Sequence, residues 1–401
     1  MATPADFAYD VVVVGGCGHV GLPLAVAFAS RGLRVAIQDI DAGAVELVGS
    51  GELPFREDGA QEVLAAALAE GRLHVTTDPE VLGQAEAVVV VIGTPVDEHL
   101  NPDPRAVKKA LVTSMSHFRD GQLLVLRSTV YPGVTRGVEK LFEEAGLAVD
   151  VAFCPERIAE GKAMEELFSL PQIVSGRTQG ARDRAARLFK NLTDSTVELE
   201  PEEAELAKLF TNTWRYIKFA AANQFYIMAN DHGLDFDRIR TALAYDYPRA
   251  ADMPGAGLAA GPCLFKDTMQ LAAFTDNSFQ LGHAAMQVNE GLPLYIVSHL
   301  ERNHDLSTMT VGILGMAFKG ESDDIRSSLS YKLKRILEFR AGNVLCTDPY
   351  VTVDDSLKPL EDVLENSDIL ILAAPHRVYR DLQTTKPVAD VWNFLGRGST
   401  L

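Results

Sequence analysis

The sequence has few cysteines, and they lie far apart. Only four occur among 401 residues, with no CxxC pair and no metal-ligand spacing: Cys17, Cys154, Cys263 and Cys346. This scarcity excludes a disulfide framework and a cysteine-based metal site. We therefore expect reduced thiols and no metal.

Positive charge and long apolar runs are also lacking. The chain has 37 Lys and Arg residues against 55 Asp and Glu residues, a formal net charge of −18, whereas nucleic-acid binding needs clustered basic side chains. No apolar run reaches membrane-spanning length, and residues 1–10 show no basic segment followed by an apolar one. We therefore expect a cytoplasmic protein that binds neither nucleic acid nor membrane.

What remains is the composition of an ordinary globular protein. Hydrophobic residues make up 47% of the chain and charged residues 23%. A length of 401 residues exceeds what one hydrophobic core usually supports, so two or three domains are expected. An anionic small ligand would need local positive groups set against the negative net charge.

The first third opens with a strand–turn–helix pattern. Residues 11–15 form a β-branched run typical of a buried parallel strand, residues 22–31 predict a helix, and residues 33–39 predict a second strand. Between the first strand and the helix stands a GxGxxG turn, Gly16-Cys17-Gly18-His19-Val20-Gly21. An acid, Asp39, ends the second strand 18 residues beyond the last glycine.

This arrangement predicts a dinucleotide site. The glycines allow a pyrophosphate to approach the helix N-terminus, and the acid can bind both ribose hydroxyls. Asp39 would also repel a 2′-phosphate, which favours NAD over NADP. The alternative is a glycine turn in a nucleotide-free α/β domain. The expected cofactor contacts are Gly16, Gly18, His19, Val20, Gly21 and Asp39.

Further strands are predicted at residues 87–92 and 121–126, and they end near Thr94 and Thr129. Ligands of such sheets bind at the carboxyl ends of the strands, so both threonines are candidate cofactor or site residues, with a plain helix N-cap as the alternative.

A short strand at residues 150–153 leads to Glu156 and Glu160. Their i, i+4 spacing beside the expected cleft suggests acid–base work, and a solvated helix face is the alternative.

The middle of the chain changes to helical periodicity. Residues 202–232 predict one long helix, and Lys208 and Asn212 share a side of it because they lie four residues apart. A second helix is expected at residues 235–244.

A small-residue loop, PGAGLAAGPCLFKD, then delivers Cys263, with Asp267 four residues later. If a helix starts at Pro262, the thiol and the carboxylate share a face, and the helix start favours the thiolate. The alternative is a buried structural cysteine. If Lys208 meets this loop, it can stabilise both the thiolate and a developing oxyanion.

The last third repeats the opening pattern. Residues 311–315, 343–348 and 368–374 predict strands in the same order, with an acid again ending the second one, but without GxGxxG. A second NAD is not expected. Lys319 and Arg326 offer positive groups for a different phosphate ligand, and surface salt bridges are the alternative for each.

The predicted fold is therefore α/β. Two Rossmann-like doubly wound domains, residues 1–198 and 301–401, are joined by a helical central domain, residues 199–300.

Several separate stretches together resemble the UDP-glucose/GDP-mannose dehydrogenase family. They are spread from Val11 to Asn393: VVVVGGCGHVGLPLA, VVVVIGTPVDEHLNPD, RSTVYPGVT, FCPERIAEG, AELAKLFTNT, YPRAADMPGAGLAAGPCLFKD, GMAFKGESDDIRSS and DPYV. The resemblance implies NAD-dependent four-electron oxidation of the C6 hydroxyl of a nucleotide-linked hexose, of UDP-glucose or UDP-N-acetylhexosamine type, to the uronic acid. It also implies a homodimer formed through the central helices.

The resemblance further implies roles for matched residues. Cys263 would trap the aldehyde as a thiohemiacetal that becomes a thioester, and Glu160 with Thr129 would position the hydrolytic water. The groups implied to hold the C6 oxygen or to move protons are Lys208, Asn212 and Asp267. The implied substrate contacts are Glu156, Arg157, Arg249 (reaching across the dimer), Gly257, Phe318 and Lys319, in addition to Lys208 and Asn212, and the implied further cofactor contacts are Lys266 and Arg326.

Three departures from the family pattern surround the sugar. Ala260-Gly261-Pro262 stands where Gly-Gly and a His or Ser usually precede the cysteine. The loop combines features of the N-acetylhexosamine branch and the glucose branch of the family. Trp392 stands in the segment where many members carry a substrate-contacting arginine. An unusual substrate such as a CMP-, CDP- or GDP-hexose therefore stays open. Two rival interpretations are a one-step hydroxyacid-type dehydrogenase, which would not need Cys263, and a nucleotide-sugar sensor without catalysis.

Overall fold

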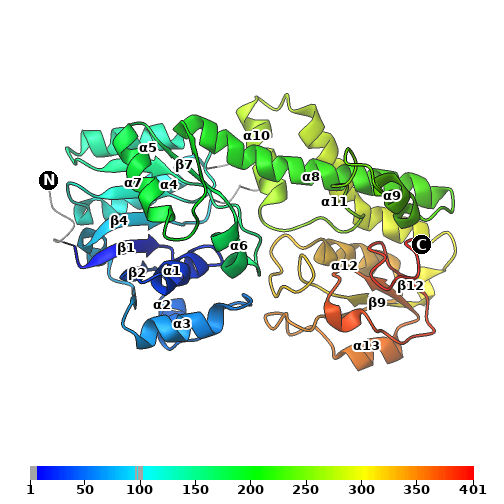
Figure 1. Cartoon of the computed structure of the whole chain (residues 1–401). Helices are drawn as coiled ribbons and strands as arrows, with labels where there is room; N and C mark the ends of the chain where they lie inside the picture. The colour runs from blue at the N-terminus through cyan, green and yellow to red at the C-terminus, as the bar shows by residue number, and fades with distance from the viewer. Residues whose placement is uncertain (1–6, 95–96, 98–102) are drawn as a thin grey trace. The chain divides into compact units, whose positions relative to one another are not determined.

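The computed structural model describes residues 7–94, 97 and 103–401, and it divides into two compact units, Met1–Phe210 and Thr211–Leu401 (Figure 1). Part of the stretch VVVVIGTPVDEHLNPD, namely residues 95–96 and 98–102, lies outside the described residues. The proposed division into three domains at residues 198 and 300 stays a prediction.

The first unit is built on an eight-stranded sheet of order β3-β2-β1-β4-β5-β6-β7-β8. Neighbouring strands are parallel except β6 and β7, which pair antiparallel. The strands are β1 (Tyr9–Val14), β2 (Val35–Gln38), β3 (Leu73–Thr76), β4 (Ala85–Val90), β5 (Leu123–Leu126), β6 (Asp150–Phe153), β7 (Gln172–Gly176) and β8 (Thr196–Leu199). The predicted doubly wound sheet is confirmed.

Helices cover both faces of this sheet, which explains the unbroken apolar runs of its strands. Val11 and Val13 of β1 belong to one hydrophobic core, whereas Val12 points into the other. The first core is closed by α1 (Gly21–Ser30), α2 (Ala42–Gly49), α3 (Ala60–Ala69), α6 (Ala163–Ser169) and α7 (Gln179–Phe189). The second is closed by α4 (Ala106–Ser114) and α5 (Val134–Glu144).

Helix α8 (Pro201–Asp231) is the long helix that the periodicity predicted, shifted by one residue at each end. It has 31 residues, about 47 Å at 1.5 Å per residue. Its buried face in the second unit includes Asn223 and Tyr226, both fully buried. Its opposite face exposes large apolar side chains, among them Trp214 and Met228.

The second unit contains a four-stranded parallel sheet of order β10-β9-β11-β12. Its strands are β9 (Thr310–Leu314), β10 (Asn343–Thr347), β11 (Ile369–Leu372) and β12 (Val388–Ala389). This order repeats that of β2-β1-β4-β5 in the first unit. The predicted second Rossmann-like half is therefore confirmed.

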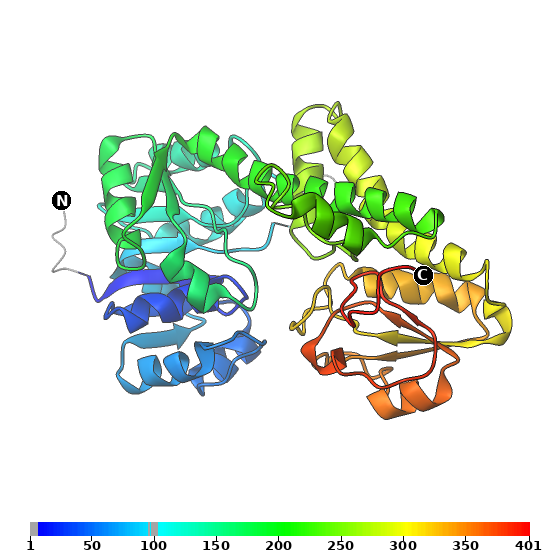
Figure 2. The same ribbon diagram turned by 45° about the vertical axis from the view of Figure 1, so that its right-hand side comes forward.

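Helices again pack on both faces of the second sheet, as Figure 2 shows. One face packs on α11 (Gln280–Leu300) and α12 (Leu329–Arg340), and the other packs on α13 (Leu360–Asn366). Two shorter helices, α9 (Phe236–Ala244) and α10 (Leu264–Phe274), complete the helical part of this unit.

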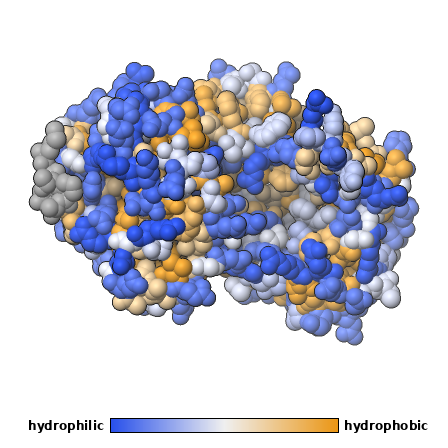
Figure 3. All heavy atoms as spheres, viewed as in Figure 1, coloured by the Kyte–Doolittle hydropathy of each residue, from blue (hydrophilic) through white to orange (hydrophobic). Residues whose placement is uncertain are grey.

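Apolar residues reach the surface unevenly. The space-filling view shows mostly hydrophilic residues over the first unit and a gathering of apolar ones over α10 and the start of α11 (Figure 3), where Phe274 and Leu281 are 42% and 57% exposed. Among the described residues, no helix is both long and apolar enough to cross a bilayer.

Candidate active site

The glycine turn after β1 is shaped by close packing on two sides. A Cβ on Gly16 would lie 2.8 Å from Ile37, and one on Gly21 would lie 2.7 Å from the backbone of Gly15 and Gly16. A Cβ on Gly18 would meet only the Gly15 oxygen, at 4.0 Å. Packing therefore requires the first and last glycines, while the middle one leaves open space.

That open space fits a dinucleotide. Helix α1 begins at Gly21 with no side-chain hydrogen bond at its N-cap, and the positive end of its dipole lies at the glycine turn. Asp39, directly after β2, accepts a hydrogen bond from the Cys17 N–H at 2.9 Å and remains partly exposed. The turn, the helix N-terminus and the acid are thus arranged to bind a pyrophosphate and a ribose.

Thr94 and Thr129 come together at the carboxyl ends of β4 and β5. The Thr94 hydroxyl donates to the Thr129 carbonyl at 2.7 Å. Thr129 is not a helix N-cap, because Gly133 is the N-cap of α5, and Arg105 is the N-cap of α4, the next described helix after Thr94. The N-cap alternative is therefore wrong for Thr129, whereas for Thr94 it stays a prediction because residues 95–96 lie outside the described residues.

Glu156 and Glu160 do not lie on a helix, so their i, i+4 spacing places them on no common helical face and the solvated-helix alternative is wrong. Residues 154–162 form a loop between β6 and α6. Glu156 is buried against the Arg127 guanidinium, and its other oxygen accepts the N–H groups of Arg157 at 2.6 Å and Ile158 at 3.0 Å. These contacts connect the ends of β5 and β6.

Glu160 is held by its neighbours on both sides. Its carboxylate lies 2.7 Å from His19 Nδ1 of the glycine turn. The N–H group before it, of Ala159, donates to Glu166, and the N–H group after it, of Gly161, donates to Glu57 at 2.8 Å. The Glu57 side chain is buried and also accepts the Ala163 N–H at 2.7 Å.

In the second unit, Cys263 stands at the N-cap of α10, which begins at Leu264 and thus two residues later than Pro262. Cys263 is exposed, so the alternative of a buried structural cysteine is wrong. The other three cysteines are buried, and burial raises the pKa of each thiol to about 12: Cys17, Cys154 and Cys346.

Asp267 lies one turn into α10 and is fully buried. Its N–H donates to the Cys263 carbonyl at 2.9 Å, and its carboxylate accepts from the Asn212 amide at 2.6 Å. Lys266 Nζ lies 3.5 Å from the other carboxylate oxygen. The structure thus brings Asn212, Lys266 and Asp267 together beside the cysteine. Lys208 lies in the first unit and is 8% exposed.

The loop before Cys263 is fixed by partners that the sequence did not reveal. The Asn223 amide donates to the Gly257 carbonyl at 3.1 Å and accepts the Gly257 N–H at 2.9 Å. A Cβ on Gly257 would lie 2.2 Å from the Trp392 ring, and one on Gly261 would lie 2.6 Å from the Phe318 ring. Two aromatic rings therefore pack directly on the loop backbone, one of them on the predicted substrate residue Gly257.

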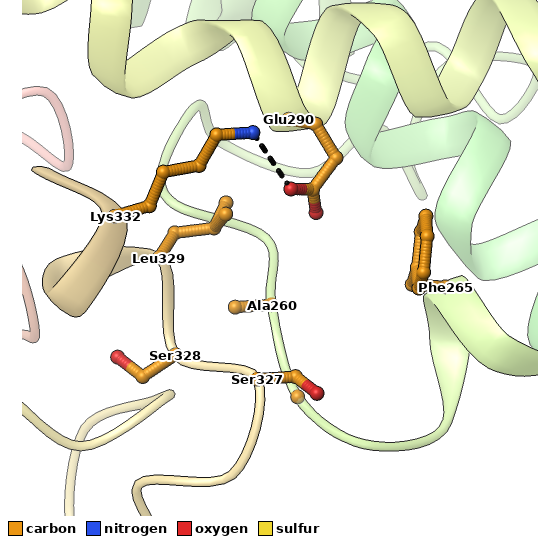
Figure 4. Close-up of a pocket in the computed structure, with 8 residues that line it drawn as sticks. Ala260, Phe265, Glu290, Ser327, Ser328, Leu329 and Lys332 are labelled. Carbon is orange, nitrogen blue, oxygen red and sulfur yellow. Dashed lines mark hydrogen bonds and ion pairs between the residues drawn. The ribbon is translucent and has the colours of Figure 1, made fainter. Parts of the chain in front are cut away.

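A pocket of about 200 Å³ lies against this loop (Figure 4). Gly261 and Phe265, on either side of Cys263 in the sequence, help to line it. Across the pocket, Lys332 and Glu290 form an ion pair of 3.0 Å, and Ser327 and Ser328 lie below them in Figure 4. The remaining lining residues are Ala260 and Leu329.

Four further predicted contacts have local partners. Arg157 donates to the Pro171 carbonyl, and Arg249 is exposed with its guanidinium over the Tyr247 ring. Lys319 Nζ lies 5.7 Å from the Phe318 ring centre. Arg326 forms the ion pair considered as the alternative, with Asp324 at 2.6 Å, yet its side chain stays 54% exposed. The role of each as a ligand contact stays a prediction.

Comparison with known proteins agrees with this geometry. Three domain models of one family match the chain in succession: the NAD-binding domain over residues 10–193, the central domain over residues 202–291 and the UDP-binding domain over residues 312–397.

The chain belongs to the UDP-glucose/GDP-mannose dehydrogenase family.

Individual family members are similar over almost their whole length. The UDP-N-acetyl-D-mannosamine dehydrogenase of Pyrococcus horikoshii is 30% identical over 385 residues, which cover 92% of this chain and 90% of the relative. The Yersinia pestis enzyme of the same name is 28% identical, with 94% and 96% covered. The structure of a UDP-glucose dehydrogenase from Pyrobaculum islandicum superposes with a TM-score of 0.89 at 30% identity, covering 97% of this chain and 95% of that one.

The family member described here is an NAD-dependent nucleotide-sugar dehydrogenase. When NAD is bound, its nicotinamide accepts the hydride; the protein supplies position and charge. The residues that would hold NAD are those of the glycine turn together with Asp39.

Sequence patterns missed the side chains that support this site. Glu57 and Asn223 each bond the backbone of a loop far away in the chain, 104 and 34 residues distant. Asn223 had one visible sign, an amide among the apolar residues of a long helix. Glu57 had none, because its partners are backbone groups.

Proposed function

We propose that this dehydrogenase oxidises the C6 hydroxyl of a UDP-linked hexose to the carboxylate, with Cys263 as the covalent nucleophile. The observation that supports this most is the setting of Cys263. It is the exposed cysteine at the start of α10, and directly behind it lies a buried Asp267 bonded to Asn212. A cysteine at a helix start is favoured as thiolate, the reactive form.

The chemistry divides a four-electron oxidation into two hydride transfers. The C6 alcohol first loses a hydride and a proton and becomes an aldehyde. Cys263 Sγ adds to the aldehyde carbon, and the resulting thiohemiacetal loses a second hydride and a proton to give a thioester. Lys208 and Asn212 would stabilise the charge on the C6 oxygen in these steps, and Asp267 would hold Asn212 and assist proton transfer.

Water then ends the reaction. Its oxygen adds to the thioester carbonyl carbon, and the carbon–sulfur bond breaks with its electron pair left on Sγ. Glu160, with Thr129, would orient that water and accept its proton. One alcohol, two NAD and one water thus give one carboxylate and two NADH.

The substrate proposal rests on the family. Relatives named for UDP-N-acetyl-D-mannosamine and for UDP-glucose are about equally similar to this chain, which favours a UDP-hexose over the CMP-, CDP- and GDP-linked alternatives. The cytoplasmic location predicted from the sequence remains part of this proposal. A match across all three domains favours this reaction over one-step hydroxyacid oxidation, which would not need the UDP-binding domain.

The test is stoichiometry combined with one substitution. Wild-type protein should release two NADH per uronic acid in a screen of UDP-, GDP-, CDP- and TDP-hexoses. Cys263→Ala should form no acid, a loss of at least about 10³-fold for a missing nucleophile, while its NAD affinity stays within about twofold.

The matched control is Cys346→Ala, the same change at a buried cysteine of the same unit, which should keep the activity. One NADH per turnover with a free aldehyde or ketone would refute the proposal, as would normal acid formation by Cys263→Ala. No turnover on any nucleotide sugar by the wild type would favour the sensor alternative.

We also propose a homodimer through α8. Three large apolar side chains lie on one exposed face of this helix, at spacings of eleven and fourteen residues: Trp214 (57% exposed), Phe225 (49%) and Met228 (57%). Arg249, exposed after α9, would then reach the partner's substrate. Light scattering should show a dimer for the wild type and a monomer for Trp214→Glu/Phe225→Glu, whereas Phe339→Glu, at an exposed side chain of α12, should leave the dimer intact.

A further inference from the structure

The glycine turn contains a side chain that contacts a carboxylate of a distant loop. His19 Nδ1 lies 2.7 Å from Glu160 Oε1, with the two side chains 23% and 16% exposed. Backbone N–H groups and glycines suffice for binding a pyrophosphate. The contact therefore connects the dinucleotide turn to the carboxylate that the proposed mechanism uses last.

The imidazole cannot swing freely, because its ring stacks on Phe55. The two ring centres are 4.0 Å apart with an interplanar angle of 28°, and Phe55 is 9% exposed. Two residues further along the same segment, Glu57 accepts the N–H groups of Gly161 and Ala163. Residues 55–57 thus hold both members of the pair, the His19 ring directly and Glu160 through the backbone of the residues that follow it.

We propose that His19 is a positioning residue for thioester hydrolysis. It holds the Glu160 carboxylate through the ion-pair contact of 2.7 Å between Nδ1 and Oε1, so that Oε2 is turned to the water. This inference rests on the proposed function, since it assigns Glu160 to the hydrolytic water. His19 does not touch the substrate and takes no part in either hydride transfer.

His19 supports the hydrolysis of the thioester. The water oxygen bonds to the thioester carbon, the carbon–sulfur bond breaks, and its electron pair stays on Cys263. One water proton moves to Glu160 and then to solvent. A carboxylate held on one oxygen by a neighbouring side chain keeps a fixed rotamer, and its other oxygen stays ready for that proton.

The test separates hydrolysis from oxidation. His19→Phe keeps a ring to stack on Phe55 but removes the nitrogen that contacts Glu160, whereas His19→Asn keeps an amide group close to the position of Nδ1. In rapid-mixing experiments with UDP-glucose and NAD, His19→Phe should show a fast burst of two NADH per active site. Steady-state turnover should then fall about 10-fold, as expected for the loss of one direct pair contact. Acid-quenched intact mass should show an acyl adduct that maps to Cys263.

His19→Asn should recover most of the steady-state rate and lose the burst. The control His74→Phe, at an exposed histidine on β3 of the same unit, should behave as wild type. A structural role in the glycine turn alone would instead raise the KM for NAD and slow the first NADH without any adduct, and that result would overturn the inference. So would wild-type turnover in His19→Phe.

If the proposed covalent mechanism itself is wrong, the adduct experiments give a different result. Glu160→Gln should accumulate the Cys263 adduct whatever His19 does. If neither Glu160→Gln nor His19→Phe ever traps an acyl group on Cys263, the covalent mechanism is wrong and the role of His19 in it falls too. An adduct in Glu160→Gln but none in His19→Phe would refute the His19 inference alone.

Discussion

The two Rossmann-like halves place an aspartate at the same point, after the second strand of each sheet, and use it differently. Asp39 accepts the N–H groups of Cys17 at 2.9 Å and Asp41 at 3.2 Å and stays partly exposed. The Asp348 side chain is inaccessible to solvent and lies 3.0 Å from the His376 ring. It also accepts four backbone N–H groups, at 2.6–3.1 Å: those of Met316, Ala317, Tyr350 and Val351.

The difference explains how one backbone pattern serves two ligands. An aspartate with an exposed edge can bind a ribose, whereas one surrounded by protein donors has no oxygen left for a ligand. In the second half Asp348 instead fixes the loop before α12, which includes Phe318 and Lys319. This agrees with a match to a UDP-binding rather than an NAD-binding domain over residues 312–397.

His376 completes that arrangement. Its ring is fully buried, and its Nδ1 accepts the Glu321 N–H at 3.0 Å, so Nε2 bears the proton that it donates to Asp348. Burial raises the pKa of Asp348, but the bonds from His376 and the backbone lower it more, so the pKa lies below the ordinary value of 3.8. The carboxylate is therefore needed in its charged form.

The most sensitive test of this difference is to neutralise Asp39 and Asp348 in separate variants. Asp348→Asn would place an amide donor among five donors and should lower the free energy of unfolding by about 3 kcal/mol. Asp39→Asn leaves an exposed group and should cost less than about 1 kcal/mol. Urea unfolding followed by circular dichroism measures both, and equal losses would show that the two acids are used alike.

The pH dependence of the stability loss in Asp348→Asn serves as the control for this prediction. Because the folded-state pKa of Asp348 is lowered, its stabilisation is complete above the unfolded value near 3.8 and disappears as the pH falls through the folded value. The difference in unfolding free energy between wild type and Asp348→Asn should thus be greatest near pH 6 and shrink below about pH 4. A difference that stays constant down to pH 3 would contradict the assigned charge.

A smaller effect is expected on cofactor choice, and only from the first half. Asp39→Ala removes the acceptor for two ribose hydroxyls and the charge that repels a 2′-phosphate. The ratio of kcat/KM for NAD to that for NADP should fall about 10- to 100-fold, equivalent to 1.5–3 kcal/mol for bonds to a charged group. Steady-state kinetics with each cofactor measures this. Unchanged preference would mean that Asp39 does not face the ribose.

The sheets of both halves were predictable because their strands are buried on both faces. A strand buried on both faces has an unbroken apolar sequence, such as Val11 to Val14. GxGxxG indicates a dinucleotide site only because a strand precedes it and a helix follows it. The N-cap place of Cys263 was predicted within two residues for a similar local reason, since Gly261 and Pro262 mark a helix start.

The loop with Glu156 and Glu160 could not be predicted in this way. The spacing of four residues between the two glutamates suggests a helix. The backbone N–H groups of residues 157–159 and 161, however, donate to side-chain carboxylates and not to the carbonyls four residues earlier. One of those carboxylates, Glu57, comes from about a hundred residues away. Sequence patterns report interactions between residues close together in the chain. The conformation of this loop depends instead on contacts with residues distant in the sequence, which no local pattern reveals.

The smallest predicted effect concerns Gly18, the glycine that packing does not require. A Cβ there meets nothing closer than 4.0 Å, so Gly18→Ala should change the free energy of unfolding by less than about 0.5 kcal/mol. The same methyl would occupy the space kept for the pyrophosphate, so the KM for NAD should rise by about an order of magnitude. Gly312, in the second half, is different, because a Cβ there would lie 2.5 Å from Ser367 and 2.7 Å from Leu370. Gly312→Ala should therefore destabilise the fold without changing the KM for NAD. If Gly18→Ala also unfolded the protein, the fold itself would require glycine at position 18. The comparison would then fail, because neither half would contain a glycine that is needed only for ligand binding.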